Sequence, residues 1–171
     1  MSPSKDNLFA CFREDHKVLG AGFHQLSTHL RAGQTSEACA VARHLNQAAG
    51  AHIAFEEMEF YPRLMPFFGR DEANRMREEH QLGLAVIQAL VNRQDAGPLD
   101  PGTCARLLAQ SESMEAHIAD CAELFGAMGR IPAVEQSVLH QKLLAWRKRQ
   151  PTWTDFATER PSPQRGQDDN P

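Results

Sequence analysis

The sequence lacks the features that would place the chain in a membrane or on a nucleic acid. No apolar run approaches the roughly 18–20 residues that a membrane-spanning helix needs. The N-terminal residues MSPSKDNLF have no basic stretch followed by an apolar one, so we expect no signal peptide and a cytoplasmic protein. Lysine and arginine are scattered and the formal net charge is −4, which argues against a nucleic acid partner.

Several catalytic and structural motifs are also missing. The four cysteines form no CxxC pair and no dense framework, so we expect reduced thiols. The chain has no GxSxG sequence, no glycine-rich phosphate loop and no zinc-ribbon cysteine spacing. Patterns typical of β-strands are nearly absent. No motif therefore supports a nucleophilic or nucleotide-dependent enzyme, and a helical fold is favoured.

Long segments with helical periodicity are present instead, separated by clusters of Gly, Pro and Asp. Asp100 followed by Pro101 is a strong helix start. Thr35 or Ser36 can cap another helix, and a turn is expected over Pro66–Gly69. We expect helices over about residues 5–30, 35–65, 70–92, 101–128 and 132–149.

Four helices of roughly 25 residues with short connections predict an all-α fold, an up-down-up-down antiparallel four-helix bundle. Together with the short fifth helix, the bundle is expected to span residues 1–149. From residue 150 to residue 171 the chain has no apolar period and holds four of the ten prolines. We predict a mostly disordered C-terminal tail there, and nothing local decides whether Trp153 and Phe156 dock on the bundle.

Four of the eight histidines lie in the apolar stripes of the four long helices, one in each helix. In the first helix the stripe passes through Phe12, His16 and Leu19. The corresponding residues of the other helices are His52, His80 and His117. A single core histidine is more often a hydrogen-bonded structural residue than a ligand, but one in each helix favours a shared site.

Glu56 supports this interpretation because it follows His52 by four residues and therefore lies on the same helix face. A carboxylate in an apolar stripe costs several kcal/mol unless it is paired or bound to a metal. Imidazole nitrogens and carboxylate oxygens suit iron, zinc or manganese. The residues predict a metal site whose candidate ligands are His16, His52, Glu56, His80 and His117.

Over about residues 8–128 the chain resembles the hemerythrin-like family, the HHE cation-binding domain. The family has one histidine on the first helix, His-x-x-x-Glu on the second, histidine on the third and His-x-x-x-Glu on the fourth. The matching segments are EDHKVL around His16, AHIAFEEMEFYP around His52 and Glu56, REEHQLG around His80, and EAHIADCAELF around His117. The resemblance implies bound non-haem iron and roles in sensing or handling O2, NO or peroxide, or in buffering iron.

Two ligands of the family's full set are absent from this chain. Cys121 and Ala122 stand where the family usually has a second bridging carboxylate, and Met76 where oxygen carriers have another histidine. Two close divalent ions repel each other, so with Glu56 as the one certain anion a second ion should bind weakly, which leaves one or two iron ions open. Further candidate ligands are Glu59, on the stripe of Glu56, and Cys121 as a thiolate, which is otherwise a small buried hydrophobe.

Other functions remain as alternatives. A degenerate bundle without metal can serve as an interaction or scaffold module, and a low-turnover peroxidase or an iron donor for cluster repair is a third hypothesis. A ferritin-like site needs Glu-x-x-His on two helices, and Arg77 and Met114 occupy those glutamate positions. The acidic runs EEMEF and REEH are expected to place Glu57, Glu78 and Glu79 on solvated helix faces.

Overall fold

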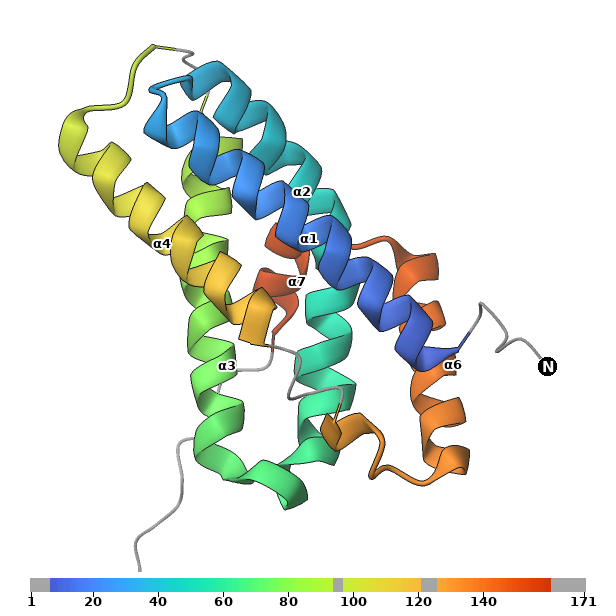
Figure 1. The fold of residues 1–171 in the computed structure, drawn as a ribbon. Coiled ribbons are helices and arrows are strands. Elements are labelled where there is room, and N and C mark those ends of the chain that lie inside the picture. Colours follow the sequence, from blue (N-terminus) through green and yellow to red (C-terminus); the bar gives the residue numbers. More distant parts are fainter. Residues whose placement is uncertain (1–6, 94–96, 121–125, 161–171) are drawn as a thin grey trace, which may run out of the picture.

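The computed structural model describes residues 7–93, 97–120 and 126–160, and these residues form an all-α bundle without strands (Figure 1). The prediction of a helical bundle is therefore confirmed. The helices are α1 (Leu8–Arg31), α2 (Thr35–Phe55), the π-helical turn η1 (Glu56–Phe60), α3 (Tyr61–Val91), α4 (Pro101–Asp120), α6 (Ala133–Arg149) and α7 (Trp153–Glu159).

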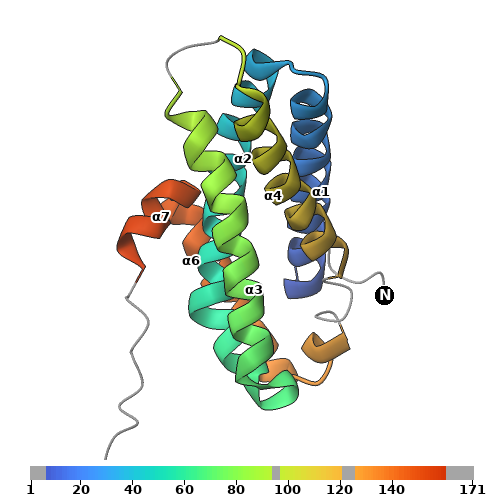
Figure 2. The same ribbon diagram turned by 90° about the vertical axis from the view of Figure 1, so that its left-hand side faces the viewer.

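Four long helices enclose the interior. Helix α1 packs against α2 and α4, and α3 also packs against α2 and α4. Helix α6 adds to the outside of α1 and α2, and α7 lies against α2 and α3, as Figures 1 and 2 show from two sides. None of the helices among the described residues is both long enough and apolar enough to cross a membrane.

Local sequence signals explain where two of the helices begin. The side chain of Asn7 caps α1, accepting a hydrogen bond of 2.9 Å from the backbone N–H of Ala10. Asp100 caps α4 as predicted, since its Oδ1 accepts a hydrogen bond of 2.9 Å from the backbone N–H of Thr103. Both side chains satisfy a backbone donor that the first turn of a helix leaves free.

The helix expected over about residues 35–65 contains a π turn and continues past Pro66. Its chain passes from α2 through the π turn η1 into α3 without leaving the helical path, and Pro66 lies inside α3. The direction changes only at Gly69, where φ is 84° and ψ is 167°. A positive φ is readily adopted by glycine, so Gly69 and not Pro66 sets the break.

Buried apolar side chains form two clusters. One contains Leu19 and Leu84 and fills the space toward the α1–α2 connection, and the other contains Phe12 and Met76 and extends to α6. His16 stands between Phe12 and Leu19 on α1, and His80 stands between Met76 and Leu84 on α3. The buried histidines therefore lie between the two apolar clusters.

The prediction of a disordered segment from residue 150 onward is wrong for the part that the structure describes. Residues 153–159 form α7, whose first turn is closed by a capping box of Thr152 and Asp155. Trp153 and Phe156 are buried against the bundle. The remainder of that prediction, over residues 161–171, lies outside the described residues.

Two glycines, one on α2 and one on α3, make room for α7 and the residues that precede it. A Cβ at Gly50 would lie 1.9 Å from the backbone oxygen of Pro151, and one at Gly83 would lie 2.7 Å from Trp153 Cη2. The Asn46 side chain also exchanges two hydrogen bonds of 3.0 Å with the backbone N–H and the hydroxyl of Thr154. Burial of two aromatic rings and these polar contacts hold α7 on the bundle.

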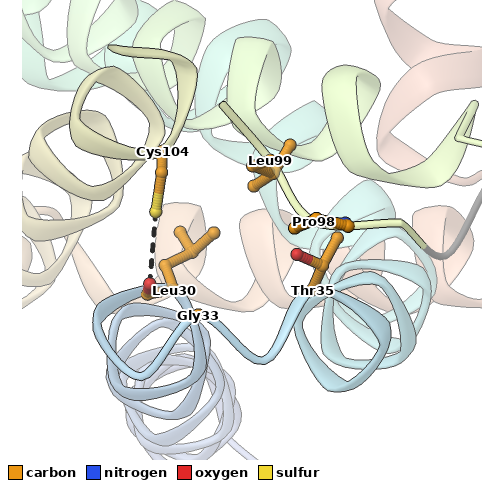
Figure 3. A pocket seen from close by; sticks show the side chains of 6 residues that line it. All are labelled: Leu30, Gly33, Thr35, Pro98, Leu99 and Cys104. Atoms are coloured by element: carbon orange, nitrogen blue, oxygen red, sulfur yellow. Dashed lines mark hydrogen bonds between the residues drawn. The ribbon is translucent and has the colours of Figure 1, made fainter. Parts of the chain in front are cut away.

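A small pocket of about 50 Å³ lies at the connection between α1 and α2 (Figure 3). Leu30, which lines it, is fourteen residues after His16, or about 21 Å along the helix axis. The pocket is therefore separate from the buried histidines. Its lining residues are Leu30, Gly33, Thr35, Pro98, Leu99 and Cys104.

Candidate metal centre

Five buried side chains from α1, α2, η1, α3 and α4 meet in the interior of the bundle. Their nitrogen and oxygen atoms form two groups, and within each group the atoms lie no more than 4.8 Å apart. The first group is His16, His52 and Glu56, and the second is Glu56, His80 and His117. The structure thus brings together all five residues of the predicted main ligand set.

Glu56 is shared between the two groups, with one oxygen toward each. Its Oε1 lies 3.4 Å from His52 Nε2 and 3.8 Å from His16 Nε2. Its Oε2 lies 3.2 Å from His80 Nε2, which in turn is 3.2 Å from His117 Nε2. The carboxylate therefore stands between two pairs of imidazoles.

The π turn η1 begins at Glu56 and places two neighbouring carboxylates inside the protein. Glu56 and Glu57 are both buried, with exposed fractions of 1% and 5%. A π turn is wider than an α-helical turn, so residues three positions apart no longer share one face. This is why Glu59 does not join Glu56.

Glu59 was predicted as a possible additional ligand, and the structure corrects that prediction. Its carboxylate pairs with the ammonium group of Lys142 on α6. Among the described residues, the two groups of potential metal ligands do not include Glu59. The other additional candidate, Cys121, lies outside the described residues.

All four buried imidazoles are oriented by a hydrogen bond at Nδ1, which leaves Nε2 facing the interior. Each Nδ1 lies next to an oxygen that can only accept, so Nδ1 carries the proton. Three of these acceptors are carboxylates. The pairs are His16 with the Phe12 carbonyl (2.8 Å), His52 with Asp15 (3.1 Å), His80 with Glu57 (3.0 Å) and His117 with Glu79 (2.6 Å).

Each of the three carboxylates is itself paired with an arginine. The N···O distances are 2.6 Å for Arg147 and Asp15, 2.5 Å for Arg160 and Glu57, and 2.5 Å for Arg75 and Glu79. Carboxylates that hold the Nδ1 of a metal-binding histidine fix the ring and increase its basicity. The arrangement around the four imidazoles is the one that metal-binding histidines have.

Glu57 and Glu79 were predicted to lie on solvated helix faces, and both predictions are wrong. Glu57 is buried against His80, because the π turn rotates it inward. Glu79 is partly buried and reaches His117 across the α3–α4 interface, a contact that no spacing within one helix reveals. Glu78 is exposed, as expected.

Tyr61 is a further residue at the centre, and it was not predicted from the sequence. Its side chain is buried, and its hydroxyl lies 3.2 Å from His80 Nε2. The ring also stacks on the imidazole of His80, with 5.7 Å between centroids. The one signal for it was an aromatic residue directly before Pro62, which indicates nothing about where the hydroxyl points.

Mutual charge effects shift the pKa values of Glu56 and of two neighbouring imidazoles. Burial acts to raise the pKa of Glu56, but the imidazoles of His52 and His80 outweigh it and hold that pKa well below its usual range. Burial acts to lower the pKa of His52, but Glu56 and Asp15 raise it to about 9. Burial is likewise outweighed at His80, whose pKa is raised by Glu56 and Glu57.

The other histidine of each pair shows the opposite shift. Burial and the neighbouring His52 lower the pKa of His16 to about 4. Burial and the neighbouring His80 lower the pKa of His117. One imidazole in each pair therefore favours the protonated state and the other the neutral state, so positive charge collects next to Glu56.

The donor atoms fit a metal ion. Among the described residues, Glu56 Oε1 is buried and has no hydrogen-bond partner, and a buried acceptor without a partner is costly. His80 Nε2 faces Glu56 Oε2, His117 Nε2 and the Tyr61 hydroxyl, all at 3.2 Å, although it has at most one proton to donate. A cation supplies the charge that these atoms require, and imidazole nitrogen with carboxylate oxygen suits iron, zinc or manganese.

The remaining histidines do not approach the centre. His24 and His29 contact Glu115 and Gln34 on the surface. His44 is exposed, and His140 Nε2 lies 3.6 Å from Cys11 Sγ. The histidines of the apolar stripes are thus the clustered ones, and the other four lie elsewhere.

Comparison with known proteins agrees with this geometry. The hemerythrin HHE cation binding domain matches residues 7–129, a span that contains the four clustered histidines and Glu56. Helices α6 and α7 lie beyond the matched span. No curated protein and no solved structure matches the chain significantly.

Proposed function

The chain belongs to the hemerythrin HHE cation-binding domain family, and on this premise we propose that it is a non-haem iron protein that binds a diatomic ligand such as O2 or NO. The observation that carries the proposal is the position of Glu56, which offers one buried oxygen to each of two histidine pairs. Handling of peroxide and buffering of iron use the same centre and are the related roles of the family.

The residues form two donor sets. His16 and His52 would hold one ion with Glu56 Oε1, and His80 and His117 would hold a second with Glu56 Oε2. When bound there, ferrous iron would supply an electron and an open coordination position for O2 or NO. The protein contributes oriented nitrogen donors, a bridging carboxylate and an interior from which bulk water is largely excluded.

The absence of a second bridging carboxylate at the matching positions predicted a weakly bound second ion. The outer carboxylates of Asp15, Glu57 and Glu79 do not replace that charge, because an arginine pairs with each of them, but they increase the basicity of the imidazoles of both donor sets. We therefore propose two ion positions, with the number of ions that bind determined by experiment.

The enclosure of the centre favours a small ligand. The five donor residues are at most 8% exposed. The ring of Phe12 covers His16 and His52, with centroid distances of 4.5 Å and 4.8 Å. A diatomic molecule fits such surroundings better than a larger substrate does.

Iron content measured after anaerobic reconstitution tests the proposal. Protein without a histidine tag is loaded with Fe(II), desalted and analysed for iron per chain, and NO is then added. We expect one to two iron ions, a visible absorption change with NO, and loss of both in His52→Ala. The exposed His44 on the same helix provides the matched control, His44→Ala.

The opposite result is equally clear. Wild-type protein that retains no iron, and whose melting temperature does not change with Fe(II) or with a chelator, would contradict the proposal. A ligand that binds the folded state must stabilise it, so an unchanged melting temperature means no binding. The bundle would then be an interaction or scaffold module.

A further inference from the structure

The helices beyond the family match reach the candidate centre through two arginines. Arg147 on α6 donates a hydrogen bond of 2.6 Å to Asp15, whose other oxygen accepts from His52 Nδ1. Arg160, directly after α7, donates a hydrogen bond of 2.5 Å to Glu57 Oε1, which also accepts from His80 Nδ1. Each arginine therefore acts on one imidazole through one carboxylate.

Burial makes the carboxylate of Glu57 dependent on its arginine. The Glu57 side chain is 3% exposed, and that of Arg160 is 22% exposed. A buried carboxylate without a cationic partner is costly, and it turns toward solvent. That movement removes the acceptor that orients His80. Arginine suits this role because its guanidinium stays charged in proteins.

Helix α7, which directly precedes Arg160, is fixed by contacts of its own. Trp153 fills the space above Gly83, and its ring lies 6.4 Å from the ring of His80. The guanidinium of Arg160 lies 5.6 Å from the centre of the Phe156 ring. The position of Arg160 thus follows from the docking of two aromatic side chains.

The two arginines act on different halves of the centre. His52 belongs to the set with His16, and His80 to the set with His117. The third outer carboxylate, Glu79, is paired with Arg75 on its own helix and within the matched span. Of these three carboxylates, Asp15 and Glu57 are therefore the two whose arginines come from α6 and from the residue after α7.

We propose that α6 and α7 belong functionally to the metal centre, with Arg147 and Arg160 as positioning residues that set metal affinity separately in its two halves. This inference rests on the proposed metal function. It assigns the C-terminal helices a role that the family match does not cover. Loss of a group that hydrogen-bonds to a metal-binding histidine lowers metal affinity by about 10–100-fold. For an arginine that pairs with such a group, we expect a loss of about tenfold.

Titration of the metal-free full-length chain with Co(II), followed by visible absorption, measures the affinities. We expect Arg147→Gln and Arg160→Gln each to weaken one binding step about tenfold and to leave the other step unchanged, and the double variant to weaken both. The control is Arg149→Gln, because Arg149 links α6 to Glu159 of α7 at 2.8 Å on the surface. Arg160→Lys, which keeps the charge, should recover part of the affinity.

A second readout needs no metal. In protein labelled with ¹⁵N-histidine, Arg160→Gln should accelerate solvent exchange of the His80 Nδ1 proton, and Arg147→Gln that of the His52 Nδ1 proton. Arg149→Gln should leave both unchanged. These signals report the orientation of each imidazole separately. A general loss of stability in the C-terminal helices would change both signals and not one of them.

The possible failures are distinguishable. Wild-type protein that takes up no Co(II) overturns both the proposed function and this inference. Wild-type protein that binds Co(II), with Arg147→Gln and Arg160→Gln indistinguishable from Arg149→Gln in affinity and proton exchange, overturns this inference alone. Melting temperatures of the metal-free variants identify any that fail to fold, and Arg160→Lys then replaces Arg160→Gln.

Discussion

Trp153 occupies the space that a side chain at position 83 would need: a Cβ added to Gly83 would lie 2.7 Å from Trp153 Cη2. It would also lie 2.5 Å from Met114 Cγ. The absence of a side chain at this position in α3 therefore lets α7 pack next to His80.

Replacement of Gly83 is expected to destabilise the protein. In Gly83→Ala, Trp153 and Met114 must both move away from the new methyl group. Such overpacking lowers the free energy of unfolding by about 1–3 kcal/mol. Gly20→Ala is the matched control, because its Cβ would meet Ile118 at an ordinary 3.4 Å. Alanine in that helix interior is expected to be neutral or stabilising by up to about 1 kcal/mol. Urea unfolding of both variants measures the difference, and equal midpoints would contradict the packing described.

Two glutamates of the π turn should differ in their effect on metal binding. Glu56→Gln removes the charge shared by both donor sets, so the rise in melting temperature that Fe(II) gives the wild type should largely disappear. Glu59→Gln should keep that rise, because the Glu59 carboxylate pairs with Lys142. Thermal unfolding with and without Fe(II) tests this, and an equal loss in both variants would return Glu59 to the ligand set.

Glu57 should affect metal affinity although it is not one of the five candidate ligands, because it accepts the hydrogen bond from His80 Nδ1. Glu57→Gln keeps the size of the side chain but removes the charge next to His80, and metal affinity in that half should fall by about 10–100-fold. Glu78→Gln is the control, since Glu78 is exposed. Co(II) titration measures both. An unchanged affinity in Glu57→Gln would mean that the His80 orientation does not depend on it.

The stability of the metal-free protein should be greatest near pH 6.5. The pKa of His52 is about 9 in the folded chain against an ordinary 6.5, so its contribution is complete below pH 6.5 and is lost as the pH rises through 9. The pKa of His16 is lowered to about 4, so stability also falls as the pH drops from 6.5 toward 4. Glu56, whose pKa is lowered, adds to this acid loss.

Urea midpoints of chelator-treated protein between about pH 4 and pH 9 check this profile. The variant His52→Gln should weaken the decline on the alkaline side, where the raised pKa of His80 also contributes. It should weaken the acid decline as well, because His52 helps to lower the pKa of His16 and of Glu56. A wild-type midpoint that stays constant from about pH 6.5 to pH 9 would contradict the raised pKa of His52.

The sequence was sufficient for the features that depend on spacing within one helix. The apolar stripes identified His16, His52, His80 and His117, and the four-residue step from His52 identified Glu56. The cap at Asp100 followed from residue type alone. Such patterns repeat along a single element and need no knowledge of its neighbours.

Features that depend on contacts between distant elements were missed. The contact of Glu79 with His117 depends on how α3 lies against α4, and the docking of Trp153 depends on Gly83, seventy residues earlier in the chain. Glu57 and Tyr61 were missed for a local reason, because the π turn changes the angular spacing that a regular helix would have.

The π turn amounts to one surplus residue in an otherwise continuous helix. One residue of an α-helix corresponds to about 100° of rotation about the axis. The residues after the turn, beginning with Tyr61, are therefore rotated by about 100° from the positions that an uninterrupted α-helix through His52 would give them. Deletion of one residue between Glu57 and Phe60 would therefore turn the Tyr61 hydroxyl away from His80, although every residue that contacts His80 would be retained.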